Sequence, residues 1–139
     1  MKIVIDTNVL VSSLKSRRGA SYKLISILPN QNIVPVLSVP LVVEYEAVLK
    51  RADLITEISH KDIETFIDYL CNLSEFQDIY FLWRPFLADP FDDHILEVAV
   101  ASGSDAIITY NKRDFRGIEK FGLELLDPKE ILIEIGELS

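Results

Sequence analysis

Hydrophobic residues along the chain form short apolar runs that alternate with longer amphipathic segments. The runs are rich in β-branched residues, which is typical of strands buried on both faces, whereas the longer segments repeat apolar residues with helical spacing. The predicted strands are residues 3–5, 33–37, 79–83, 106–109 and 123–126. The predicted helices are residues 9–14, 20–28, 38–51, 59–73, 92–102, 114–120 and 129–138.

Strands that alternate with helices throughout predict an α/β fold with a parallel sheet covered on both faces. Pro35 lies inside one predicted strand and favours an edge position or an irregular strand there. The length of 139 residues, 49% of them hydrophobic, predicts one compact domain spanning residues 1–139.

The first predicted strand ends at Asp6, which is followed by Thr7 and Asn8. In an open parallel sheet the crevice at the carboxyl ends of the strands collects functional groups, so Asp6 is a candidate ligand. An aspartate in front of a helix is also a good N-cap. Both interpretations stay open for Asp6 alone.

Glu44 lies on a helical face with Leu41 and Val48, which directs a carboxylate towards packed protein. The nearby Glu46 has an ordinary explanation, because Lys50 follows four residues later as a surface partner. Glu44 has no such explanation and is a second candidate ligand.

Three aspartates open the predicted helix at residues 92–102. Asp89 precedes a proline and suits the N-cap, and Asp92 suits the positive end of the helix dipole. Asp93 lies one turn before Glu97 on a face that carries Leu96, so it also points towards packed protein. Asp93 is therefore the third candidate.

Asp6, Glu44 and Asp93, together with Asn111 or Asp114, would form a site of oxygen ligands if they meet. Such a site suits Mg²⁺ or Mn²⁺, and the ion relieves the repulsion between the carboxylates. Metal-assisted hydrolysis of a phosphodiester is the reaction that uses such a site most naturally. Side chains expected to orient ligands or water are Thr7, Asn8, Glu97 and Thr109.

The net charge of −8 argues against broad, non-specific binding of polyanions. Local basic residues expected to guide a phosphodiester backbone are Lys15, Arg17, Arg18, Lys112 and Arg113. A single cysteine, Cys71, excludes an intrachain disulfide framework and is expected to be a buried thiol. No apolar run approaches the roughly 20 residues of a membrane span, so we expect a soluble, cytoplasmic protein with no membrane association.

Four motifs resemble the PIN-domain family when they are taken together and in order. The resemblance is greatest to the small prokaryotic branch of toxin components related to the VapC ribonuclease toxins. It covers nearly the whole chain, from Met1 to about Leu132. The motifs are residues 5–10 (Ile-Asp-Thr-Asn-Val-Leu), 39–44, 89–97 and 109–115.

The resemblance implies a three-layer α/β/α fold and a ribonuclease that depends on Mg²⁺ or Mn²⁺. By position, Asp6, Glu44 and Asp93 match the first three acids of the family. Some relatives have Asp at the fourth position, whereas others have Asn there and Asp three residues later, as with Asn111 and Asp114 here. The resemblance further implies a homodimer that acts on RNA and is neutralised by a cognate antitoxin protein.

Two other functions compete with this prediction. A PIN-like module could bind RNA or a protein partner without cleavage, and stabilisation by added metal distinguishes it from an enzyme. A phosphatase of the haloacid dehalogenase type needs a second aspartate two residues after the nucleophile. Asn8 occupies that place, which disfavours the covalent route.

Overall fold

The computed structural model describes residues 1–51, 57–79, 87 and 90–138. The strands are β1 (Lys2–Ile5), β2 (Val34–Leu37), β3 (Glu75–Phe76), β4 (Ala106–Ile108) and β5 (Glu124–Leu126). The α-helices are α1 (Thr7–Lys15), α2 (Ala20–Ser26), α3 (Val39–Leu49), α4 (His60–Leu73), α5 (Pro90–Ser102) and α6 (Pro128–Glu134). Two 3₁₀ turns, η1 (Lys112–Phe115) and η2 (Ile118–Phe121), lie between β4 and β5.

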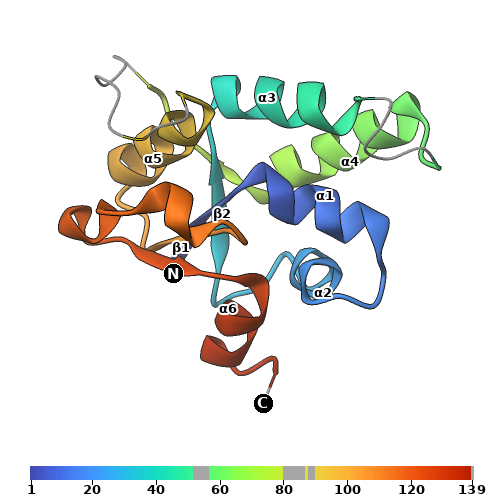
Figure 1. Cartoon of the computed structure of the whole chain (residues 1–139). Coiled ribbons are helices and arrows are strands. Elements are labelled where there is room, and N and C mark those ends of the chain that lie inside the picture. Colours follow the sequence, from blue (N-terminus) through green and yellow to red (C-terminus); the bar gives the residue numbers. More distant parts are fainter. Residues whose placement is uncertain (52–56, 80–86, 88–89, 139) are drawn as a thin grey trace.

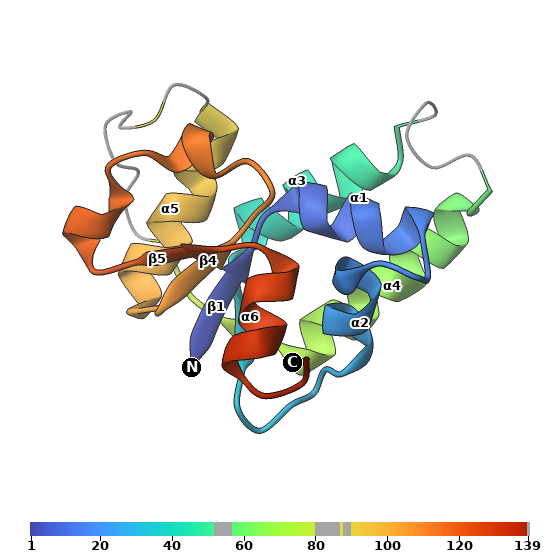
Figure 2. The same ribbon diagram turned by 60° about the horizontal axis from the view of Figure 1, so that its bottom comes forward.

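The five strands form one parallel sheet in the order β3-β2-β1-β4-β5. The neighbouring strands β1 and β2 are labelled in Figure 1. Helix α5 packs on one face of the sheet against β1, β2 and β4, while α6 and α2 lie together on the other face (Figure 2). Strand β4 is fully buried, and β1 and β2 are buried after their first residues, as expected for a parallel sheet covered on both sides. The predicted three-layer α/β fold is thus confirmed.

Pro35 does not mark an edge strand, because β3 pairs with the outer side of β2. The edge alternative therefore fails for β2 as a whole, although no described strand pairs with the outer side of β2 at Pro35 itself. Strand β3 has two residues and pairs only with Val36 and Leu37, so it ends before the level of Pro35. The missing N–H of Pro35 therefore interrupts no described pairing of the ladder.

Other differences concern short elements. Gly117, with φ at +88°, divides the predicted helix at 114–120 into the two 3₁₀ turns. The two-residue β3 was not predicted, and the expected strand at 79–83 and the N-cap at Asp89 lie largely or wholly outside the described residues. Cys71 was expected to be buried and is half-buried. Its partial burial raises the pKa of the thiol, and the nearby negative charge of Asp68 raises it further.

The sequence places candidate N-caps at Ser38, Ser59 and Asp127, and three of the helices begin directly after them. Ser38 and Ser59 accept hydrogen bonds from the N–H groups of Leu41 and Asp62, and Asp127 forms a reciprocal capping box with Glu130. Gly103 ends α5 with φ at +66°. Within the described part of the chain, no helix is long and apolar enough to cross a membrane.

The cap of α3 gives a first testable prediction. Ser38 is buried, and replacing it with alanine leaves the Leu41 N–H without its acceptor. We expect S38A to lower the free energy of unfolding by about 1 kcal/mol in urea denaturation. S26A is the matched control, because Ser26 is exposed and bonds only locally to the Lys23 carbonyl; it should change stability by less than about 0.5 kcal/mol. Equal losses in both variants would contradict this role of Ser38.

Candidate active site

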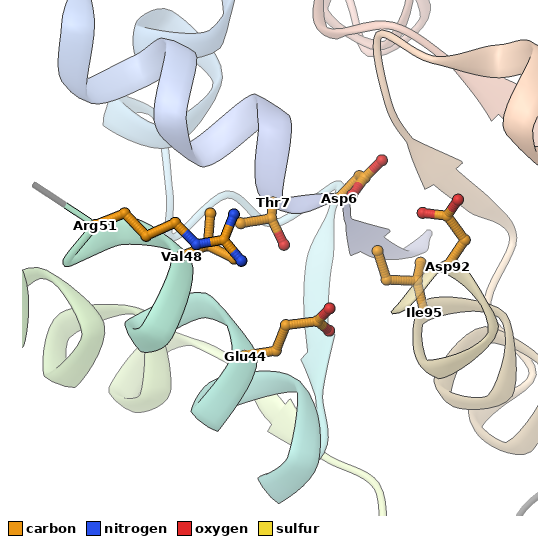
Figure 3. Close-up of a pocket in the computed structure, with 7 residues that line it drawn as sticks. All are labelled: Asp6, Thr7, Glu44, Val48, Arg51, Asp92 and Ile95. Carbon is orange, nitrogen blue, oxygen red and sulfur yellow. The ribbon is translucent and has the colours of Figure 1, made fainter. Parts of the chain in front are cut away.

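A pocket of about 320 Å³ lies beside the carboxyl end of β1, between α1, α3 and α5. Its volume is at the lower end of the range for ligand sites. Figure 3 shows Asp6, Glu44 and Asp92 around it, each from a different element. The residues that line it are Asp6, Thr7, Glu44, Val48, Arg51, Asp92 and Ile95.

Asp6 is held rigidly at the end of β1. Its backbone N–H donates to the Ile108 carbonyl at 2.9 Å, which extends the pairing of β1 with β4. Its Oδ2 accepts hydrogen bonds from the Thr109 hydroxyl at 2.8 Å and from the Asn8 amide at 3.1 Å. Although Asp6 occupies the N-cap position of α1, its side chain makes no capping hydrogen bond. Of the two interpretations of Asp6, the structure favours the one that places its carboxylate in the crevice.

The network around Asp6 continues into the segment after β4. The side-chain amide of Asn8 also donates to the Thr109 hydroxyl at 3.4 Å, and its Oδ1 accepts the backbone N–H of Tyr110 at 3.3 Å. The Thr109 hydroxyl in turn accepts the N–H of Asn111 at 3.0 Å. Asn8 and Thr109, which were predicted to orient ligands, thus contact Asp6 directly, and Thr7 lines the pocket.

Helix α3 brings Glu44 to the same pocket, as its helical face predicted. The Glu44 side chain is only 10% exposed, and its Oε2 lies 3.9 Å from Nδ1 of His94 on α5. The neighbouring Tyr45 is fully buried, and its hydroxyl donates a hydrogen bond to the carbonyl of Ile5. Tyr45 therefore fastens α3 to the end of β1, immediately before Asp6.

The environment of Tyr45 shows how negative this region is. Burial raises the pKa of its hydroxyl well above the usual value, and the nearby negative charges of Asp6 and Glu44 raise it further. Carboxylates gathered in a poorly solvated pocket favour a cation beside them.

On α5 the pocket is lined by Asp92 rather than by Asp93. Asp93 is 7% exposed, and its Oδ1 accepts the backbone N–H of Leu87 at 2.9 Å. Glu97, one turn later, is buried as well, and of the two only Asp93 was expected as a ligand. The overlooked signal is the i,i+3 spacing of Asp92 and Ile95, which puts both on the helix face at the pocket.

Asn111 and Asp114 lie outside the lining of this pocket. Both are exposed, and Asp114 belongs to η1, where its N–H donates to the Asn111 carbonyl at 3.0 Å. Asp6 and Glu44 of the predicted set thus line one pocket, while Asn111 is linked to Asp6 through the Thr109 hydroxyl.

The predicted RNA-binding residues differ in their surroundings. Lys15, Arg17 and Arg18 are exposed at the end of α1 and in the turn that follows it. Lys112 forms an ion pair with Glu130. The hydrogen bond from Lys112 holds the pKa of the Glu130 carboxyl below its ordinary value, and a backbone hydrogen bond from Asp127 lowers that pKa further. Arg113 is exposed. A further basic residue, Arg51, lines the pocket itself and was not expected there.

The acidic pocket is open rather than a closed metal cage. Among the residues that the structure describes, no three His, Cys, Asp or Glu side chains converge closely enough to form a ready-made cluster. Mg²⁺ is commonly held by one or two carboxylates and keeps several waters, which suits such an open set of oxygen donors. The donor set fits a hard divalent cation and offers no thiolate for a softer one.

Comparison with known proteins places this geometry in a family. The family model described as PIN domain matches residues 2–113. Among solved structures, the chain is similar to VapBC2 from Rickettsia felis bound to a DNA fragment from their promoter, with a TM-score of 0.63 and 16% identity over 91% of this chain and 100% of the other. No curated protein matches the chain. The family match spans most of the sequence, and the chain belongs to the PIN-domain family.

Proposed function

We propose that this protein is a metal-dependent endoribonuclease that hydrolyses phosphodiester bonds in RNA. The observation that carries the proposal is the pocket that Asp6, Glu44 and Asp92 line from the end of β1, from α3 and from α5. PIN domains are in general nucleases that use divalent metal ions, and the acids of this pocket supply the ligand chemistry such a reaction needs.

Asp6, Glu44 and Asp92 would hold Mg²⁺ or Mn²⁺, directly or through water. When bound, the ion supplies Lewis-acid polarisation of the phosphoryl oxygen and charge stabilisation at the leaving oxygen. The protein supplies orientation: Thr109 and Asn8 occupy Oδ2 of Asp6, which fixes the direction of its other oxygen.

Asp93, Asn111 and Asp114 take outer positions in this proposal. Asp93 was expected to be the third ligand, and we assign that role to Asp92, because Asp92 lines the pocket while Asp93 binds the backbone of Leu87. Asn111 and Asp114 lie on the exposed rim, where they could act on a bound substrate or a second ion through water.

The biological role proposed is that of a toxin component. The similar structure from Rickettsia felis is a VapBC2 assembly, and its fold is shared by this chain. We propose that a cognate antitoxin protein covers the pocket, that the chain forms a homodimer, and that its RNA substrate is encountered in the cytoplasm. The exposed basic residues that would guide the RNA are Lys15, Arg17, Arg18 and Arg113, with Lys112 tied to Glu130.

A second candidate is a module that binds RNA or a protein without cleaving it. The observation in its favour is that the described acids do not form a closed metal cluster and that Asn111, an amide, stands at the fourth family position. The two functions differ in their response to metal.

The first prediction of the proposed function concerns stability. An ion that binds only the folded protein adds about 2.7 kcal/mol at 100 times its Kd, which corresponds to a rise of roughly 10 °C in Tm for a domain of this size. We expect Mn²⁺ and Mg²⁺ to raise Tm in a saturable way and EDTA to reverse the effect. In the D6N and E44Q variants the rise should be lost. A Tm that does not respond to either metal would favour the binding module.

The second prediction compares the adjacent aspartates of α5. Purified wild-type protein, D92N and D93N are incubated with total RNA and Mn²⁺, and the cleaved ends are mapped. We expect D92N to lose more than about 100-fold in cleavage rate, since it removes a ligand, while its circular dichroism is unchanged. D93N should cleave RNA but unfold more easily, by about 1–3 kcal/mol, because its buried charge-assisted hydrogen bond is weakened. The opposite pattern in a folded pair of variants would assign the ligand to Asp93.

A further inference from the structure

We infer that Arg51 is a substrate-binding residue of this pocket, which holds a backbone phosphate of the RNA beside the metal. The inference rests on the proposed function and assigns a residue for which neither the motifs nor the basic clusters of the sequence indicated a role in the pocket. Its basis is the position of Arg51 in the pocket lining, across from Asp6 and Asp92.

Helix α3 presents an acid and a base to the same cavity. Glu44, Val48 and Arg51 follow the spacing i, i+4 and i+7, which places them on one side of the helix, and the C-cap residue Lys50 is still in the helical region. Figure 3 shows the Arg51 guanidinium directed into the pocket near Thr7, with the carboxylates of Asp6 and Asp92 at the other end.

Arg51 also differs from its neighbour in what it binds. Lys50 is held by two carboxylates, with its Nζ 2.9 Å from Glu46 and 3.0 Å from Glu64. No ion pair joins Arg51 to a carboxylate in the described ranges, and its side chain is exposed at the pocket. Its guanidinium is thus available to an anion that enters the cavity.

The charge balance of the pocket explains why such a cation is useful. Three carboxylates carry a charge of −3, and a divalent ion reduces this to −1, which still repels a phosphodiester. Arg51 brings the total to zero before the substrate arrives. A guanidinium also binds two phosphate oxygens at once, which would orient the backbone as well as attract it.

The test measures binding and cleavage of a fluorescein-labelled single-stranded RNA by wild-type protein, R51A and R51K. The binding arm uses Ca²⁺, an oxygen-liganded ion, and the cleavage arm uses Mn²⁺. K129A is the matched control, because it changes the net charge by the same amount as R51A. Lys129 is an exposed cation on α6, a helix that packs against α2 and β5.

We expect R51A to raise Kd and KM about tenfold or more, to reduce the salt slope of log Kd by about 0.7, and to keep the rise of Tm with metal. R51K should retain the salt slope and recover part of the affinity, and K129A should behave as wild type. An R51A variant that binds RNA no worse than K129A would overturn the inference, as would loss of the metal response in R51A, which would make Arg51 a residue that positions the carboxylates instead.

The two proposals fail separately. Wild-type protein that binds RNA in an Arg51-dependent way but never cleaves it would refute the nuclease and leave the role of Arg51 standing. Cleavage that is indifferent to Arg51 would do the reverse. Wild-type protein that neither binds nor cleaves RNA would refute both.

Discussion

The hydrogen bonds between Asp6 and Thr109 join the ends of β1 and β4, and the rest of the site depends on this junction. The register of the two strands pairs Ile5 with Ile108, so the next residues on each strand meet directly beyond the sheet. A slip of one residue would turn Asp6 to the other face and separate it from Thr109. The buried central strands, which are packed from both sides, are what prevents that slip.

Around this junction the fold places negative charge where solvation is poor. Asp6 and Glu44 are nearly buried, and both raise the pKa of the Tyr45 hydroxyl that links α3 to β1. Such a concentration of carboxylates is costly in a folded protein unless a cation compensates it. The three acids, together with the guanidinium of Arg51 directed into the same pocket, suit a metal and a phosphate rather than a metal alone.

Much of this could be predicted from the sequence. Apolar runs predicted β1, β2, β4 and β5, and capping residues predicted where α3, α4 and α6 begin. Both kinds of signal depend only on residues close together in the sequence. The two-residue β3 lacks a hydrophobic pattern, and the positive φ of Gly117 divided one predicted helix. Asp6 and Glu44 were correctly directed to one pocket.

The two differences between the predicted site and the observed pocket have a common physical origin. The periodicity of hydrophobic residues gives the buried face of a helix but not the rotation of the helix against the sheet. The sequence therefore could not tell which of Asp92 and Asp93 lines the pocket. Arg51 follows the last helical turn, where a sequence pattern does not distinguish a pocket wall from a solvated surface.

The most direct test is a crystal structure of the wild-type protein soaked with Mn²⁺, with data collected at a wavelength that gives an anomalous signal from manganese. The account predicts a peak in the pocket, within about 2.5 Å of a carboxylate oxygen of Asp6, Glu44 or Asp92, with the remaining acids reached directly or through water. The absence of a peak at saturating Mn²⁺, or a peak held only by Asn111 and Asp114, would contradict it.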